Sequence, residues 1–292
     1  MPANSGNLTL CATPPDRTPL GPLLGAAGVY LIALTLTGVV FVLTRGGQQV
    51  DGELLPRAER GGSYRQDTAL LGPAKALLAF FGDVGVLAVL LTAVVLTAAL
   101  SRRFWAGLAG VAVFGCAVGA AKLLKAAILR PDLGVDGSTT HNSFPSGHVA
   151  AAAGLLCAGL LAVPARARWW VAVPGAAGVT AVASATMIVG WHRLSDVVGA
   201  VLLALLVCCL AAAALAHRRG VTRPPGRAAW LKGALLLLLT PLPALVTAVP
   251  AGEGPLTAIV AASVATALAV APVLLLLDTI DFTAGTAKTL SQ

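Results

Sequence analysis

Residues 197–216 read VVGAVLLALLVCCLAAAALA, a run of 20 residues without a charged side chain. A helix of about 20 apolar residues is long enough to cross the hydrocarbon core of a bilayer. The whole chain has this character: of its 292 residues, 57% are hydrophobic and 11% are charged, and its mean hydropathy is +0.87. An average soluble domain has about 25% charged residues, so too few polar side chains are present here to coat a water-facing surface. This composition excludes a soluble fold, a nucleic-acid binder and a disordered chain.

Apolar runs of similar length recur along the chain and predict an all-α, polytopic bundle of transmembrane helices. Eight runs are found, over residues 21–44, 76–100, 104–129, 149–163, 169–189, 197–216, 234–249 and 256–277. The organisation that we expect is an N-terminal tail (1–20), a first helix and loop (21–75), a core (76–216), a basic linker (217–233), and two further helices with a tail (234–292).

The formal net charge of +8 is best explained by membrane topology. Basic residues gather in cytoplasmic loops. The links after the second, fourth and sixth predicted helices contain nine basic residues and no acidic one: Arg102, Arg103, Arg166, Arg168, Arg218, Arg219, Arg223, Arg227 and Lys232. We therefore expect an integral protein of a bacterial cell membrane with both termini cytoplasmic. The loops after the third, fifth and seventh helices then face outward.

Polar residues collect in two segments that this topology brings to the same outer face. One segment contains Lys122, Lys125 and Arg130 and continues to Ser143–His148, which reads SFPSGH; the other is residues 191–196, which read WHRLSD. Charged groups near membrane depth are costly and mark functional sites. Two Lys, two Arg and two His against two Asp predict a site for an oxyanion, and phosphate is the one that we expect.

The spacing of these residues predicts how phosphate is bound. Pro145, Ser146 and Gly147 precede a helix, whose free N–H groups and dipole attract an anion. Gly147 allows the backbone to approach closely, and the Ser146 hydroxyl adds a donor.

The histidines predict how phosphate reacts. His192 and Asp196 are four residues apart and share one face of a helical turn. A carboxylate that accepts from one imidazole nitrogen leaves the other nitrogen nucleophilic. His148, from the other segment, can then protonate the leaving oxygen as a general acid.

These residues resemble the motifs of the type-2 phosphatidic acid phosphatases, membrane enzymes whose site is shared with the vanadium haloperoxidases. Ser143–His148 resembles the second motif, the pair His192/Asp196 the third, and Arg130-Pro131 the end of the first. The resemblance covers roughly residues 77–216 and implies a six-helix core, to which this chain adds two C-terminal helices.

The resemblance also implies roles for single residues. His192 would form a phosphohistidine, Asp196 would orient it, and His148 would be the acid. The phosphoryl oxygens would be held by Arg130, Ser146, Gly147 and a lysine. The family needs no metal or other cofactor, and the five cysteines show no metal-ligand spacing.

The chain departs from the family's pattern at two places. The first motif has Lys seven residues before Arg, where this chain has Leu123. Lys122 and Lys125 are the candidates, and Lys125 is favoured because it is nearer the outer surface. The third motif has a Ser-Arg pair seven and six residues before His, where this chain has Ala185 and Thr186. Arg193 is the obvious substitute for that arginine, unless it points to lipid headgroups.

The expected function is a membrane phosphatase with an extracytoplasmic site. Its partners would be membrane lipids and a lipid phosphate substrate: a polyprenyl diphosphate, phosphatidic acid or phosphatidylglycerol phosphate. One alternative is a phosphotransferase, in which an alcohol replaces water. Another is a catalytically weakened lipid-binding or transport relative. The sequence leaves the oligomeric state open. It also leaves two interpretations of Asp83, within the second predicted helix: a partner of the basic cluster, or a polar group in helix packing.

Overall fold

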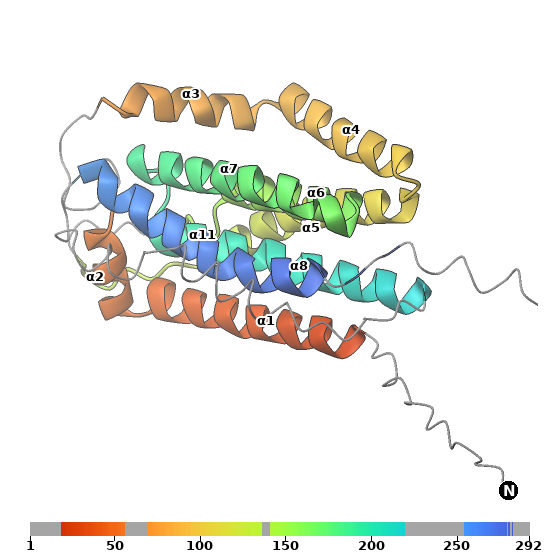
Figure 1. The fold of residues 1–292 in the computed structure, drawn as a ribbon. Coiled ribbons are helices and arrows are strands. Elements are labelled where there is room, and N and C mark those ends of the chain that lie inside the picture. Colours follow the sequence, from red (N-terminus) through yellow and green to blue (C-terminus); the bar gives the residue numbers. More distant parts are fainter. Residues whose placement is uncertain are drawn as a thin grey trace, which may run out of the picture.

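The computed structural model describes residues 19–55, 69–135, 141–219 and 254–278, together with 280 and 282. In chain order the helices are α1 (Leu20–Leu43), α2 (Arg45–Glu53), α3 (Leu71–Gly82), α4 (Val84–Leu100), α5 (Phe104–Ala127), α6 (Gly147–Ala162), the short 3₁₀ helix η1 (Ala165–Ala167), α7 (Arg168–Ile188), α8 (Leu194–Arg219) and α11 (Gly254–Asp278). These ranges contain no strand (Figure 1), which confirms the all-α prediction. The predicted helix over residues 234–249 lies outside the described residues.

Length and composition give the bundle its polytopic character. Within the described ranges, five helices are long and apolar enough to cross a membrane: α1, α5, α7 with η1, α8 and α11. The bent pair α3 and α4 makes a sixth span if it is counted as one. The orientation of these spans relative to the cytoplasm stays a prediction.

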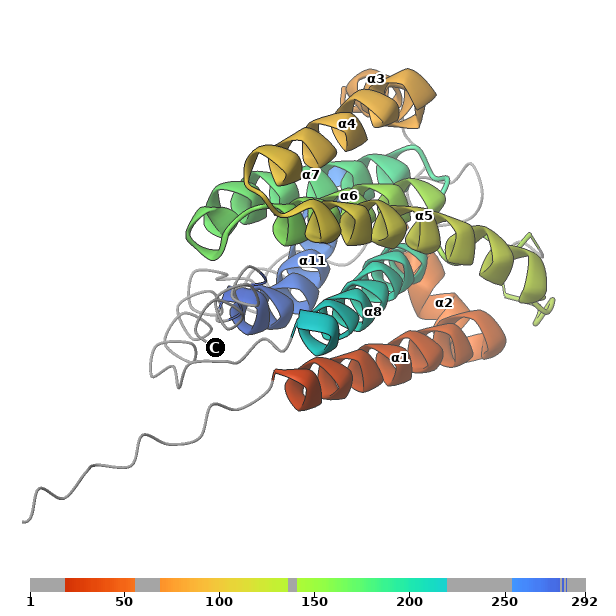
Figure 2. The same cartoon turned by 90° about the vertical axis from the view of Figure 1, so that its right-hand side faces the viewer.

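Helix α6 is the centre of the bundle. Thirteen of its 16 residues are buried, and it packs against α5, α7 and α8 (Figure 2). Its sequence, GHVAAAAGLLCAGLLA, consists mostly of Ala, Gly and Leu, and small residues allow neighbouring helices to approach closely. At the crossing with α5, a Cβ placed on Gly110 would lie 2.9 Å from the carbonyl oxygen of Ala158. The N-terminus of α6 therefore lies among the ends of its neighbours, which is where the site forms.

The second predicted span is not one straight helix. Helices α3 and α4 meet at Asp83 with a bend of 61°. The Asp83 side chain is exposed, and its Oδ1 accepts a hydrogen bond from the backbone N–H of Val86 at 2.9 Å. Asp83 is thus the N-cap of α4, because its carboxylate satisfies a free N–H of the first turn. Neither interpretation of this residue drawn from the sequence considered a cap, which is the role that this contact shows.

Two arginines that the sequence analysis counted among the basic loop residues are buried, at the end of the bundle opposite to the N-terminus of α6. Arg103 and Arg168 are each 2% exposed, and their guanidinium carbons lie 6.0 and 5.4 Å from the ring centroid of Phe282. Arg168 donates to Leu160 O at 3.1 Å and to Ile280 O at 2.8 Å, and also bonds Leu277 O. It therefore caps the C-terminal end of α11 and fixes that helix against α6 and α7.

Near the site, the ring of Phe144 determines how close α8 can come. Phe144 is 1% exposed, and a Cβ placed on Gly199 would lie 2.3 Å from its Cε2. The ring has little freedom to withdraw, because a Cβ placed on Gly38 of α1 would be 3.4 Å from its Cε1. The absence of a side chain at position 199 is what allows the loop before α6 to pack against α8.

Replacing this glycine should destabilise the fold. We expect Gly199→Ala to lower the free energy of unfolding by about 1–3 kcal/mol, the usual effect of overpacking a core. Gly178→Ala, on α7, is the matched control, because a Cβ there meets no atom within 4 Å. Thermal unfolding in detergent measures both. Equal unfolding temperatures for the two variants would contradict this packing account.

Candidate active site

The carboxylate of Asp196 joins the two predicted segments. It is fully buried, and its Oδ2 accepts three hydrogen bonds: from Ser143 Oγ at 2.6 Å, from the backbone N–H of Arg193 at 2.9 Å and from His192 Nδ1 at 3.2 Å. The backbone N–H of Ser146 also donates to Asp196 O at 3.0 Å. The segment before α6 and the first turn of α8 are therefore held together, as the topology predicted.

The turn between α7 and α8 positions His192. Gly190 has a φ of +78°, a conformation that glycine adopts without steric cost. Beyond it, the N–H groups of Trp191 and His192 both donate to Thr186 O, at 3.0 and 3.2 Å. Because an ionised carboxylate can only accept, its contact with Nδ1 requires the proton to be on that nitrogen. Nε2 then carries the free lone pair, as a nucleophile requires.

Helix α6 brings the second motif to the same place. Ser146 is buried as the N-cap of this helix, where its Oγ accepts from Val149 N at 3.4 Å. The position of Gly147 is open, with no atom within 4 Å of a Cβ built there. His148 is half-buried and within electrostatic range of His192, and its ring centroid is 5.8 Å from that of Trp191. The two histidines therefore converge, as the predicted nucleophile and acid must.

Two buried arginines make the site strongly attractive to an anion. Arg130 and Arg193 are each 4% exposed and are within electrostatic range of each other. Burial, and then the charge of Arg193, lower the pKa of Arg130. Among the described residues, the three guanidinium nitrogens of Arg130 have no hydrogen-bond partner. A buried guanidinium without acceptors is costly, and phosphoryl oxygens are the acceptors that its fork geometry fits.

The structure also distinguishes between the candidates for the lysine of the first motif and shows where the candidate for the arginine of the third motif lies. Arg193 is buried beside Arg130 rather than exposed at the surface. Lys125 is half-buried and within electrostatic range of His148, whereas Lys122 is exposed. Thr186 is fully buried, with its hydroxyl donating to Ala183 O at 2.7 Å. Arg193 and Lys125, but not Lys122, are therefore part of the cluster.

Several polar residues that support the site were not singled out from the sequence. Asn142 fixes the loop before α6 to the end of α5, since its Nδ2 lies 3.2 Å from Lys125 O and 2.9 Å from Ile128 O. Gln48 and Asp51 come from α2, in a stretch expected to be only a loop, and Ser195 binds Asp51. The sequence contains no regular spacing that could have connected α2 with these motifs.

The space around His192 is small in this conformation. A hollow of about 10 Å³ is bounded by Leu55, His141, Ser143 and residues 190–193. That is about the volume that one water needs. No group of His, Cys, Asp or Glu within the described ranges could hold a metal ion. Among the described residues, cationic side chains that gather at the site are Arg130, Arg193 and Lys125.

One comparison with known proteins finds a match, to a protein family. Residues 103–219, from the start of α5 to the end of α8, match the family model described as PAP2 superfamily. Over this segment the chain is similar to the PAP2 superfamily. The match confirms the predicted resemblance to type-2 phosphatidic acid phosphatases, a superfamily of generally phosphatase activity. It contains every predicted site residue and leaves out α1 to α4 and α11. No curated protein and no solved structure is significantly similar to the chain.

Removing one of the hydrogen-bond donors to Asp196 tests whether these bonds are needed for activity. We expect Ser143→Ala to lower kcat/KM by about 10- to 100-fold, since a hydrogen bond to a charged group contributes about 1.5–3 kcal/mol. Ser263→Ala is the control, because that hydroxyl binds only Ile259 O of its own helix, at 2.6 Å. A folded Ser143→Ala protein with the wild-type value would mean that Asp196 does not need this donor.

Proposed function

We propose that this PAP2-superfamily protein is an integral membrane phosphatase that hydrolyses a lipid phosphate or diphosphate through a phosphohistidine. The observation that carries the proposal is the His192–Asp196 pair beside two buried arginines. It supplies a nucleophile of fixed tautomer next to cations that can stabilise the charge on the phosphoryl oxygens.

The reaction has two displacements. His192 Nε2 attacks phosphorus, a P–N bond forms as the P–O bond to the lipid breaks, and His148 gives its proton to the leaving oxygen. Neutral His148 then takes a proton from water, whose oxygen attacks phosphorus and releases His192. The products are inorganic phosphate and a lipid alcohol, or a lipid monophosphate when the substrate is a diphosphate.

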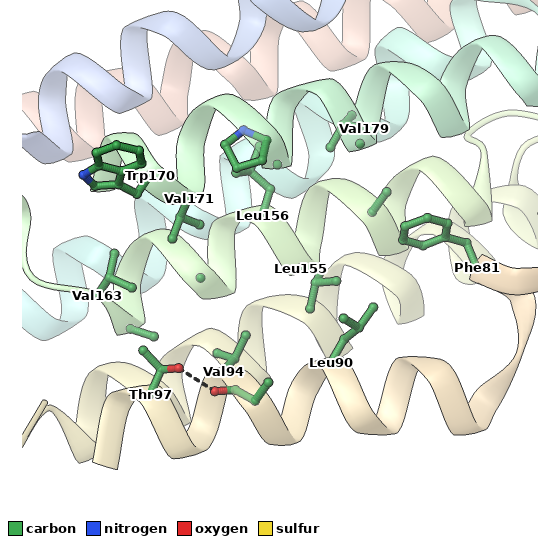
Figure 3. Close-up of a pocket in the computed structure, with 17 residues that line it drawn as sticks. Phe81, Leu90, Val94, Thr97, Leu155, Leu156, Val163, Trp170, Val171 and Val179 are labelled. Atoms are coloured by element: carbon green, nitrogen blue, oxygen red, sulfur yellow. Dashed lines mark hydrogen bonds between the residues drawn. The ribbon is translucent and has the colours of Figure 1, made fainter. Parts of the chain in front are cut away.

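An apolar groove supports a substrate with a long hydrocarbon chain. The groove lies between α4, α6 and α7, and its volume is about 440 Å³ (Figure 3). The lining contains one hydroxyl, that of Thr97, which donates to Ala93 O of its own helix at 2.7 Å. The other polar side-chain group of the lining is the indole N–H of Trp170, which is exposed. The rest of the lining side chains are apolar, and a hydrocarbon chain is the occupant that fits.

The position and length of the groove suit one chain of a lipid. One end is at Phe81, and the next residue, Gly82, is so close to the site that a Cβ on it would be 3.3 Å from His148 Nε2. Along α6 the lining covers residues 152–162, a rise of about 15 Å. That is half of a bilayer's hydrocarbon core of roughly 30 Å. A chain in the groove would thus extend through one leaflet with its headgroup near His148.

Substituting the histidines tests the chemistry. We expect His192→Ala to abolish phosphate release from every substrate, because both displacements pass through this side chain. His148→Ala should still form a phosphoenzyme from an ester with a good leaving group, since acid assistance contributes about 10²–10⁴-fold and matters less there. His217→Ala, exposed on α8, is the control. Acid-labile phosphohistidine trapped in His192→Ala would end the assignment of the nucleophile.

The phosphate-release assay also distinguishes hydrolysis from phosphoryl transfer to an alcohol. Phosphate release in the absence of an added alcohol supports hydrolysis. Product formation that depends on the alcohol would favour the phosphotransferase alternative.

A larger side chain in the groove tests whether the groove binds the hydrocarbon chain of the substrate. We expect Gly178→Leu to raise the KM of a long-chain lipid phosphate about tenfold or more, because each excluded CH₂ forfeits about 0.8 kcal/mol. A water-soluble phosphate ester without a chain should be hydrolysed normally. Gly25→Leu on α1 is the control, because position 25 is exposed and outside the groove. An equal effect on both substrates would contradict the assigned role of the groove.

A further inference from the structure

Helix α2 lies outside the PAP2-superfamily match and touches the site with a buried carboxylate. Asp51 is 1% exposed, and both of its oxygens are bound by one residue. Its Oδ1 accepts from Ser195 N at 3.0 Å, and its Oδ2 accepts from Ser195 Oγ at 2.5 Å. Ser195 directly precedes Asp196, which bonds His192. Asp51 therefore holds the first turn of α8 next to the His192–Asp196 pair.

A second contact joins α2 to the arginine loop. Gln48 is 1% exposed, and its Nε2 donates to Val42 O at 2.8 Å and to Pro131 O at 3.1 Å. Pro131 directly follows Arg130. One short helix therefore contacts both segments that supply the cations and the nucleophile.

Asp51 lies among several charged groups. Burial, followed by repulsion from Asp196, raises the pKa of Asp51 to about 6, and the hydrogen bonds from Ser195 and the charge of Arg193 oppose this rise. Asp51 in turn favours the charged form of Arg130. The charged groups that face it are thus Arg130, Arg193 and Asp196. A carboxyl whose pKa is raised on folding stabilises the protein most below its unfolded pKa of about 4, and this contribution is lost as pH rises through about 6.

At neutral pH the ionised Asp51 therefore costs stability. An asparagine could hold the same turn without that cost, if its amide oxygen accepted from Ser195 N and its Nδ2 donated to Ser195 Oγ. A purely structural role therefore does not explain the charge.

We propose that Asp51 is a positioning residue of the phosphate site, which fixes the start of α8 through Ser195 and serves as counter-ion to Arg130 and Arg193 when no phosphate is bound. The inference rests on the proposed phosphatase function. Its consequence is that an arriving phosphate competes with a resident negative charge. Asp51 thereby keeps the arginines in place between turnovers and weakens the binding of the product phosphate.

The test compares four full-length proteins in detergent: wild type, Asp51→Asn, Asp51→Ala and the control Glu53→Gln. Inorganic phosphate is the probe, both as an inhibitor of turnover and as a ligand that raises the unfolding temperature. At about pH 8, we expect Asp51→Asn to bind phosphate about tenfold more tightly than wild type, because a nearby negative charge is gone. At about pH 5 the difference should disappear, since wild-type Asp51 is then protonated as well. Glu53→Gln, exposed on the same helix, is the matched control and should leave phosphate binding unchanged.

Asp51→Ala tests the positioning role. We expect its kcat to fall at least about tenfold, because Ser195 loses two hydrogen bonds to a charged group. Equal phosphate affinity in wild type and Asp51→Asn at about pH 8 would overturn the counter-ion role. A wild-type kcat in Asp51→Ala would overturn the positioning role. If wild type neither binds nor releases phosphate, the proposed function fails, and this inference fails with it.

Discussion

A carboxylate removed entirely from water must be supplied with donors, and Asp196 obtains its donors from three places. They are the Ser143 hydroxyl, the Arg193 amide and the ring of His192. Because Ser143 precedes α6 and the other two precede α8, the two helices must begin side by side. The small residues of α6 and the bare Gly199 allow that approach, with Phe144 filling the space between. The same contacts orient the imidazole, so the packing of the bundle and the chemistry of the site depend on one buried charge.

The anion site is built from residues that different parts of the chain contribute. Thr186 occupies the position where the family's third motif has arginine, and its hydroxyl is used within α7. Arg193 has a buried guanidinium one residue after His192, the proposed nucleophile. A guanidinium at position 193 offers the same forked donors that the family's arginine would. The site thus contains two arginines, Arg130 and Arg193, although Arg193 is not at the position of the family's arginine.

How far the sequence predicts this structure depends on the range of the interaction. Long apolar runs predicted the spans, and the spacing of His192 and Asp196 predicted their contact, because both are local patterns. The break at Asp83 was missed, since hydropathy averages over the polar cap that ends one helix and begins the next. The contact of Asp51 with Ser195 joins residues 144 positions apart, and no periodicity marks such a pair. Arg103 and Arg168 were counted only as topology signals, because nothing in the sequence shows that Phe282 and the end of α11 lie against them.

In the proposed mechanism, the phosphoryl group is transferred first to His192 and then to water. Its most direct test is the stereochemical course of hydrolysis, with a phosphate ester made chiral at phosphorus by oxygen isotopes and sulfur. Each in-line displacement inverts the configuration, so two displacements predict net retention in the released thiophosphate. Net inversion would show that water attacks the substrate directly, and it would contradict the assignment of His192 as nucleophile.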